Sequence, residues 1–116
     1  MDWQGRGKVR ARHADDGAIE LSVDGVTTQA RYYKPLVYEF FRKEFVLRPR
    51  WGDFGVEIRL EHAGDPPKLD LDNLAKALLD ALKGQVFFDD MQIAQLRCER
   101  VRAERDRIWL RVWSIT

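Results

Sequence analysis

Residues 68–76 read KLDLDNLAK, and this stretch decides how the rest of the chain is interpreted. Leucine and aspartate alternate at its start, so an extended backbone would send the leucines to one side and the carboxylates to the other. Leucines then recur at intervals of three and four residues until Gly84, which is a typical stop signal. The stretch therefore predicts an extended segment that runs into an amphipathic helix over residues 72–83, with Asp70 or Asp72 as its cap.

A second acidic pair, Asp89-Asp90, follows shortly after the predicted helix. The short return between them could bring this pair back toward Asp70 and Asp72. Carboxylates that converge in this way stay ionised only when a cation sits among them. Their hard oxygen ligands favour Mg²⁺ or Mn²⁺. The pattern is not an EF-hand, because Ala81 stands where that loop needs a bidentate glutamate.

The composition of the 116 residues is that of one soluble globular domain, with 45% hydrophobic and 34% charged residues. No apolar run is long enough to predict a transmembrane span or a signal peptide. The single cysteine, Cys98, excludes an intrachain disulfide and favours a cytoplasmic location. Residues 65–90 hold six aspartates against three lysines, so this segment is acidic and the remainder is basic. An acidic centre in a basic surround suits a metal site that meets a polyanion.

The remaining periodic segments predict an α+β fold. A proline and a run of phenylalanines predict a core-packing helix over residues 35–46. Alternating apolar residues predict strands over 19–23, 54–60, 93–101 and 108–113. We expect a small mixed, mostly antiparallel sheet with the two helices packed on one face.

The start of the chain is predicted less regularly. Residues 1–17 read as a basic arm in which Arg6, Lys8, Arg10 and Arg12 alternate with other residues. Two interpretations stay open: an arm that contacts phosphates, or a flexible, solvated terminus. Asp24-Gly25 after the first predicted strand indicates a hairpin turn, with residues 26–28 beginning a return strand.

The polar face of the helix over 72–83 has two interpretations. Asp72, Lys76 and Asp80 recur at intervals of four residues and share one face. They could form an ion-pair ladder of the kind many exposed helices carry. Alternatively, Lys76 lies one turn from Asp72, so its ammonium could reach a phosphate oxygen held at a metal.

The last predicted strand also leaves alternatives open. Trp109, Arg111 and Trp113 share the face opposite its apolar residues. The tryptophans could cover a second core layer or a subunit interface, or they could stack on DNA bases. Neither histidine has the spacing of a ligand pair or a recognisable nucleophile nearby, so a catalytic triad is not supported.

Taken together, the acidic motifs resemble the RusA-type Holliday junction resolvases, small endonucleases that are mostly encoded by phages or prophages. The resemblance rests on Asp70-x-Asp72-Asn73-Leu74-x-Lys76, on Asp80-x-Leu82 and Gly84, and on Asp89-Asp90-x-Gln92-Ile93 after an aromatic residue. It implies a single endonuclease domain over residues 1–116. Upstream, residues 1–12 lack the hydrophobic strand with which family members usually begin.

The resemblance implies that Asp70, Asp72 and Asp90 are catalytic carboxylates that hold Mg²⁺, with Mn²⁺ as a substitute, and that Lys76 is the catalytic lysine. Asp89 is adjacent and could assist. The implied function is Mg²⁺-dependent resolution of four-way DNA junctions by paired symmetric nicks in recombination and repair. Two matched nicks require two active sites, so a homodimer is expected. The alternatives are a non-catalytic module that binds branched DNA on the same scaffold, and a less selective metal-dependent nuclease.

Overall fold

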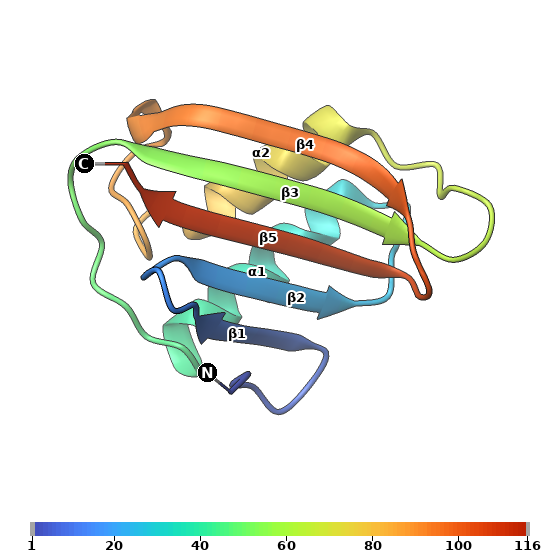
Figure 1. Cartoon of the computed structure of the whole chain (residues 1–116), viewed down its shortest axis with the longest axis horizontal. Helices are drawn as coiled ribbons and strands as arrows, with labels where there is room; N and C mark the ends of the chain where they lie inside the picture. Colours follow the sequence, from blue (N-terminus) through green and yellow to red (C-terminus); the bar gives the residue numbers. More distant parts are fainter. Residues whose placement is uncertain (1, 116) are drawn as a thin grey trace.

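Residues 2–115, which the computed structural model describes, form a five-stranded sheet with two α-helices (Figure 1). The strands are β1 (Val9–His13), β2 (Ile19–Asp24), β3 (Phe54–His62), β4 (Ile93–Arg102) and β5 (Arg107–Ser114). Their spatial order is β1-β2-β5-β3-β4, and every neighbouring pair is antiparallel except β3 and β4. The predicted α+β class and its mixed, mostly antiparallel sheet are confirmed.

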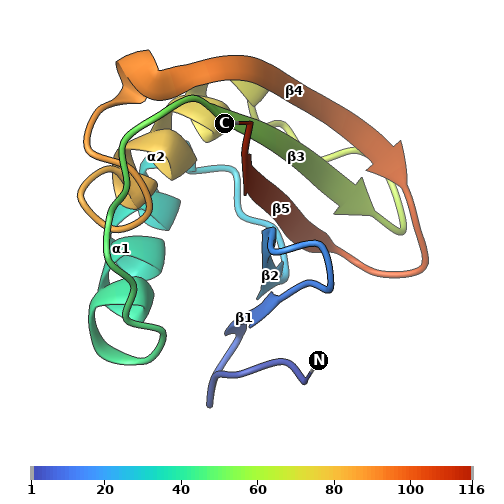
Figure 2. The same cartoon turned by 60° about the vertical axis from the view of Figure 1, so that its left-hand side comes forward.

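Both helices cover the same face of the sheet, as the second view makes plain (Figure 2). They are α1 (Tyr33–Lys43) and α2 (Leu71–Leu82), against predicted ranges of 35–46 and 72–83. A 3₁₀ turn, η1 (Ala30–Tyr32), leads directly into α1, which explains why the helix begins before Pro35. In residues 2–115 no helix is long and apolar enough to cross a membrane.

The core lies between the helices and the sheet. The leucines that predicted α2 are the ones it buries, and Leu74, Leu78 and Leu82 are fully inaccessible to solvent. Phe41 from α1 and Ile58 from β3 are equally buried. Each such side chain stabilises the fold by about 1.5–3 kcal/mol relative to leaving it exposed. This packing fixes α2 against the sheet, and α2 carries most of the predicted site residues.

Within residues 2–115, no helix covers the other face of the sheet, which carries charged and aromatic side chains instead. The Trp109 indole donates a hydrogen bond to Glu20, at 3.1 Å, and the Arg59 guanidinium lies 4.6 Å from the centre of its ring. Trp113 lies directly over Gly55, where a Cβ atom would come within 2.3 Å of the indole. The two tryptophans therefore pack on the sheet face opposite the helices, Trp109 buried under Arg59 and Glu20 and Trp113 partly buried over Gly55.

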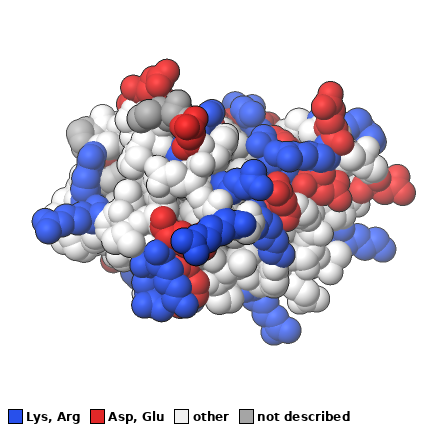
Figure 3. All heavy atoms as spheres, turned by 90° about the horizontal axis from the view of Figure 1, so that it is seen from below, with Lys and Arg blue, Asp and Glu red and all other residues white. Residues whose placement is uncertain are grey.

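The prediction of an irregular N-terminal arm is wrong for residues 9–13, which form the edge strand β1. Val9 and Ala11 are buried in the core, which leaves Arg10 and Arg12 on the opposite face. Arg12 pairs with Glu20 at 3.0 Å, so its charge is used within the fold. Seen from below, past the β1 edge, cations and carboxylates are interspersed rather than gathered by sign (Figure 3). Met1 lies outside the described residues.

The predicted hairpin through Asp24-Gly25 is also wrong. No return strand follows, because β2 is already paired with β1 on one side and with β5 on the other. Residues 26–29 instead cross toward η1, and the Thr27 amide donates to the Tyr33 hydroxyl at 3.0 Å. The hairpin that does form joins β1 to β2.

Candidate functional site

The segment that enters α2 alternates as the sequence predicts. Leu69 is buried and Asp70 is exposed. Asp70 occupies the N-cap position of α2 in an extended conformation, but its side chain does not cap the helix. Its carboxylate instead accepts a hydrogen bond from the Asn73 side chain at 3.3 Å. Asp70 therefore keeps most of its acceptor capacity for a ligand.

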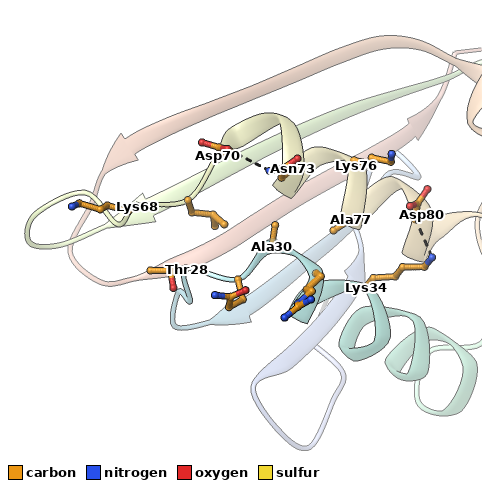
Figure 4. A pocket seen from close by; sticks show the side chains of 12 residues that line it. Thr28, Ala30, Lys34, Lys68, Asp70, Asn73, Lys76, Ala77 and Asp80 are labelled. Atoms are coloured by element: carbon orange, nitrogen blue, oxygen red, sulfur yellow. Dashed lines mark hydrogen bonds and ion pairs between the residues drawn. The ribbon is translucent and has the colours of Figure 1, made fainter.

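A cationic cleft lies along one side of α2. It is a hollow of about 580 Å³ between residues 28–34 and residues 68–80 (Figure 4). Four cationic side chains and two carboxylates line it: Arg31, Lys34, Lys68 and Lys76, with Asp70 and Asp80. The cations come from both walls, so the cleft has a net positive charge.

An acidic cleft of about 640 Å³ lies on the other side of α2, between the helix and β4. Its charged side chains are Asp72, Asp80 and Asp90 against Lys76 alone. Lys76 and Asp80 line both clefts, so the polar face of α2 forms a ridge between them. Two neighbouring hollows of opposite charge therefore share one lysine.

The predicted site residues are brought together in part. Asp72, Lys76 and Asp90 line the acidic cleft, whereas Asp70 lines the cationic cleft next to it. Among residues 2–115 no three His, Cys, Asp or Glu side chains are close enough to form a ready metal cluster. The structure thus brings Asp90 to the α2 ridge, as the short return predicted, without closing the carboxylates around one point.

The charged residues of the ridge do not form an ion-pair ladder within the described part of the chain. The nearest contact is between helices: Lys34 Nζ of α1 lies 4.0 Å from Asp80 Oδ2. Asp70, Asp72 and Asp90 have no lysine or arginine within ion-pair distance among residues 2–115. Their carboxylates are therefore available to a cation from solution, unlike Glu61, which a bidentate contact with Arg107 neutralises.

The segment that delivers Asp90 is held by Asp89 and Gln92. Asp89 caps the 3₁₀ turn η2 (Asp90–Gln92) by accepting the Met91 amide at 3.3 Å. A hydrogen bond with Asp90, together with that amide, lowers the pKa of the Asp89 carboxyl. From the sequence, Asp89 was predicted to assist Asp90, whereas in the structure its carboxylate caps the 3₁₀ turn.

In the sequence, Gln92 stood out only as part of the motif. In the structure its buried side chain links two backbone segments through hydrogen bonds. Its amide nitrogen donates to the carbonyls of Arg50 and Gly52, at 2.9 and 2.8 Å. Its amide oxygen accepts the amides of Phe88 and Asp89, at 2.8 and 3.0 Å. Gln92 therefore fixes the loop before β3 against the segment that carries Asp90.

The chain is similar to one known protein family. A family model described as "Endodeoxyribonuclease RusA" matches residues 27–113, about three quarters of the 116 residues. The chain belongs to the RusA endodeoxyribonuclease family. No curated protein matches the sequence.

The RusA match begins after β2, so β1 and β2 lie outside it, while both clefts lie wholly inside. This agrees with the departure from the family pattern that the first residues predicted. The part of the chain that differs forms the far edge of the sheet, away from α2 (Figure 1). The predicted site residues therefore all lie within the matched part of the chain.

Two further features of the region around the predicted site residues were missed from the sequence. Trp51 and Phe88 stack with ring centroids 4.2 Å apart, and both are exposed beside the segment that carries Asp90. Cys98 is half-buried and lines the acidic cleft. Burial raises the pKa of its thiol to about 11, and the Asp72 carboxylate acts in the same direction.

Proposed function

We propose that this chain is a Mg²⁺-dependent endodeoxyribonuclease that resolves four-way DNA junctions by paired symmetric nicks. The family match supports cleavage of DNA. The observation that carries the residue assignment is the α2 ridge, where Lys76 stands between a cationic and an acidic cleft. A phosphodiester strand that crosses this ridge would meet a lysine and a set of carboxylates together.

The donor set fits a hard divalent cation. Asp70, Asp72 and Asp90 offer only carboxylate oxygens, the ligands that Mg²⁺ and Mn²⁺ prefer. None is neutralised by a lysine or arginine among residues 2–115. These three residues would hold the ion, which supplies Lewis-acid activation of water and charge neutralisation at the phosphate.

The remaining roles belong to the chain itself. The Lys76 ammonium, exposed on the ridge, would stabilise charge that develops on the non-bridging phosphate oxygens. Gln92, through its four hydrogen bonds, would hold Asp90 in position beside α2. One chain carries one such ridge, so matched nicks in two strands would need two copies related by a two-fold axis.

The test is cleavage of a synthetic four-way junction with Mg²⁺ by the wild type, Asp70→Asn, Asp90→Asn and Lys76→Ala. Each variant should lose at least about 100-fold in rate, the scale at which positioned charge contributes to catalysis. Asp15→Asn, an exposed aspartate in the β1–β2 turn, is the matched control and should cut like the wild type. If Asp70→Asn and Lys76→Ala cut as fast as the control, the site assignment is wrong.

A second candidate, a non-catalytic branched-DNA-binding module, is favoured by the lack of a ready three-residue metal cluster in residues 2–115. Thermal melting with Mg²⁺ or Mn²⁺ separates the two functions. A nuclease site should be stabilised by the metal, and Asp90→Asn should abolish that stabilisation. A plain binding module should not respond to the metal.

Substrate selectivity and assembly need their own measurements. Parallel digestion of four-way junction, flap and linear duplex separates a junction resolvase from a less selective nuclease, because only a resolvase prefers the junction and cuts it symmetrically. Sedimentation should give a mass of two chains for the homodimer. A monomer that still makes paired nicks would contradict the two-fold arrangement.

A further inference from the structure

We propose that the cationic cleft is the track that holds the sugar-phosphate backbone of the DNA strand next to the cleavage site, with Arg31 and Lys34 as its outer contacts. This inference rests on the proposed function, because it names the part of the DNA that the nuclease would hold beside its α2 ridge. Neither residue belongs to the motif that identified the site. They are strand-positioning residues and not catalytic ones.

The first support is where the charge lies. Arg31 belongs to η1 and Lys34 to α1, while Lys68 and Lys76 come from the segment that leads into α2 and from α2 itself. Figure 4 shows Lys34, Lys68 and Lys76 among the side chains that line the cleft. All four are exposed at a hollow of about 580 Å³. Cations on both walls of one hollow are suited to a ligand that carries several negative charges along its length, as a nucleic-acid backbone does.

The second support is that this charge is not used within the fold. Among residues 2–115, Arg31, Lys68 and Lys76 have no carboxylate within ion-pair distance, and Lys34 has only Asp80 at 4.0 Å. Arginines on the open sheet face behave differently. Three examples are Arg12 with Glu20, Arg59 with Glu57, and Arg107 with Glu61, and in each the ion pair is intramolecular. The charges of Arg31, Lys68 and Lys76 are thus available to a ligand, as are those of other cations among residues 2–115, such as Arg10 and Arg100.

The third support is the shape of the cleft. Alanines, Ala30 from η1 and Ala77 from α2, stand where the two walls meet (Figure 4). Their short side chains leave the space open. Asp70 and Lys76 line the same cleft, so a backbone lying in it reaches the predicted catalytic residues directly. A strand that continues over the ridge at Lys76 enters the acidic cleft.

The test uses the full chain and a fluorescently labelled four-way junction with EDTA, so that DNA stays intact. Anisotropy titrations at several salt concentrations compare the wild type with the double variant Arg31→Ala/Lys34→Ala. We expect the double variant to bind roughly tenfold more weakly and to lower the slope of log K against log[salt] by about two. With Mg²⁺, its KM for the junction should rise while kcat at saturation stays near that of the wild type.

Two controls make the result specific. Arg42→Ala/Lys43→Ala removes the same charge from the far end of α1, where both residues pair with Glu39, and should leave affinity and slope unchanged. Arg31→Lys/Lys34→Arg keeps the charge and should bind like the wild type, which excludes a folding defect as the cause.

The proposal is overturned if Arg31→Ala/Lys34→Ala binds like the Arg42→Ala/Lys43→Ala control, or if the wild type shows no salt-dependent junction binding. This failure differs from failure of the proposed function. Absence of Mg²⁺-dependent junction cleavage by the wild type would reject the nuclease assignment whatever the cleft variants do. Normal junction affinity of the Arg31→Ala/Lys34→Ala variant would reject the cationic cleft as the DNA-binding track, even if Asp90→Asn is inactive.

Discussion

Gln92→Ala is the most informative single substitution, because Gln92 links fold stability to the position of Asp90. The alanine removes the side-chain amide nitrogen, which donates two hydrogen bonds, and the amide oxygen, which accepts two. Four hydrogen bonds of 2.8–3.0 Å are therefore lost. At about 1 kcal/mol net for each bond, the upper expectation is about 4 kcal/mol. Most of the residues whose backbone groups bond to Gln92 are exposed, so water can replace some of the lost hydrogen bonds. We therefore expect a loss of about 2–4 kcal/mol in the free energy of unfolding.

Urea unfolding followed by circular dichroism measures this loss. The matched control is Gln95→Ala, an exposed glutamine on β4 with no buried amide to satisfy, which should change stability by less than about 0.5 kcal/mol. Junction cleavage should fall in Gln92→Ala even where the variant is fully folded, because Asp90 is no longer fixed. If the two variants unfold at the same urea concentration, the hydrogen bonds of the Gln92 side chain do not stabilise the fold as inferred.

Gln92→Glu gives the same argument a pH dependence. The carboxylate could still accept the Phe88 and Asp89 amides, but it would face the Arg50 and Gly52 carbonyl oxygens without a proton to donate. Its pKa in the folded state should therefore rise above the unfolded value of about 4.3. A raised pKa gives stability that is present at low pH and lost as pH rises, so the deficit against wild type should grow between about pH 4 and 7. A deficit that shrinks over this range would contradict the assignment.

Three further outcomes are expected. Gly55→Ala should cost about 1–3 kcal/mol in urea unfolding, because its Cβ would lie 2.3 Å from the Trp113 ring and displace it; an unchanged midpoint would mean that Trp113 does not lie over this position. Leu78→Ala should cost about 2–5 kcal/mol in the same assay, because the fully buried side chain leaves a cavity in the core. Since the pKa of Cys98 is raised from 9.0 to about 11, its alkylation by iodoacetamide at neutral pH should be roughly 100-fold slower than that of an unperturbed thiol. Asp72→Asn, or Mg²⁺ bound at Asp72 in the wild type, should speed that alkylation, because each removes negative charge that raises the pKa of the thiol. A rate that responds to neither would mean that the Asp72 carboxylate does not act on Cys98.

Local patterns predicted the central elements well. The leucine spacing of α2 needs only the helix period, and the side chains that define it are the ones the core buries. The alternation in β3 and β5 likewise fixes which residues face the helices. The type of each predicted site residue, three aspartates and a lysine, could also be taken from the motif. In each case the information lies within a few residues of chain.

Long-range pairing decided what the sequence pattern predicted wrongly. Residues 9–13 alternate too briefly to be recognised, and they become β1 because β2 offers an edge. The predicted return strand at residues 26–28 fails for the complementary reason. The second edge of β2 is taken by β5, where Ser22 lies opposite Trp109. A pattern within ten residues carries no signal of a partner so far along the chain.

The sequence by itself thus determined the chemistry available around α2: carboxylates on its first turn, Lys76 one turn later, and a second acidic pair after the helix ends. Only the tertiary structure decided how these groups are divided. Packing of α2 against η1 and α1 brings Arg31, Lys34 and Lys68 to the walls of one cleft, and packing of α2 near β4 brings Asp72 and Asp90 to the walls of another. The physical reason is that a cleft is made by two surfaces, and the opposing wall comes from residues to which no local periodicity points.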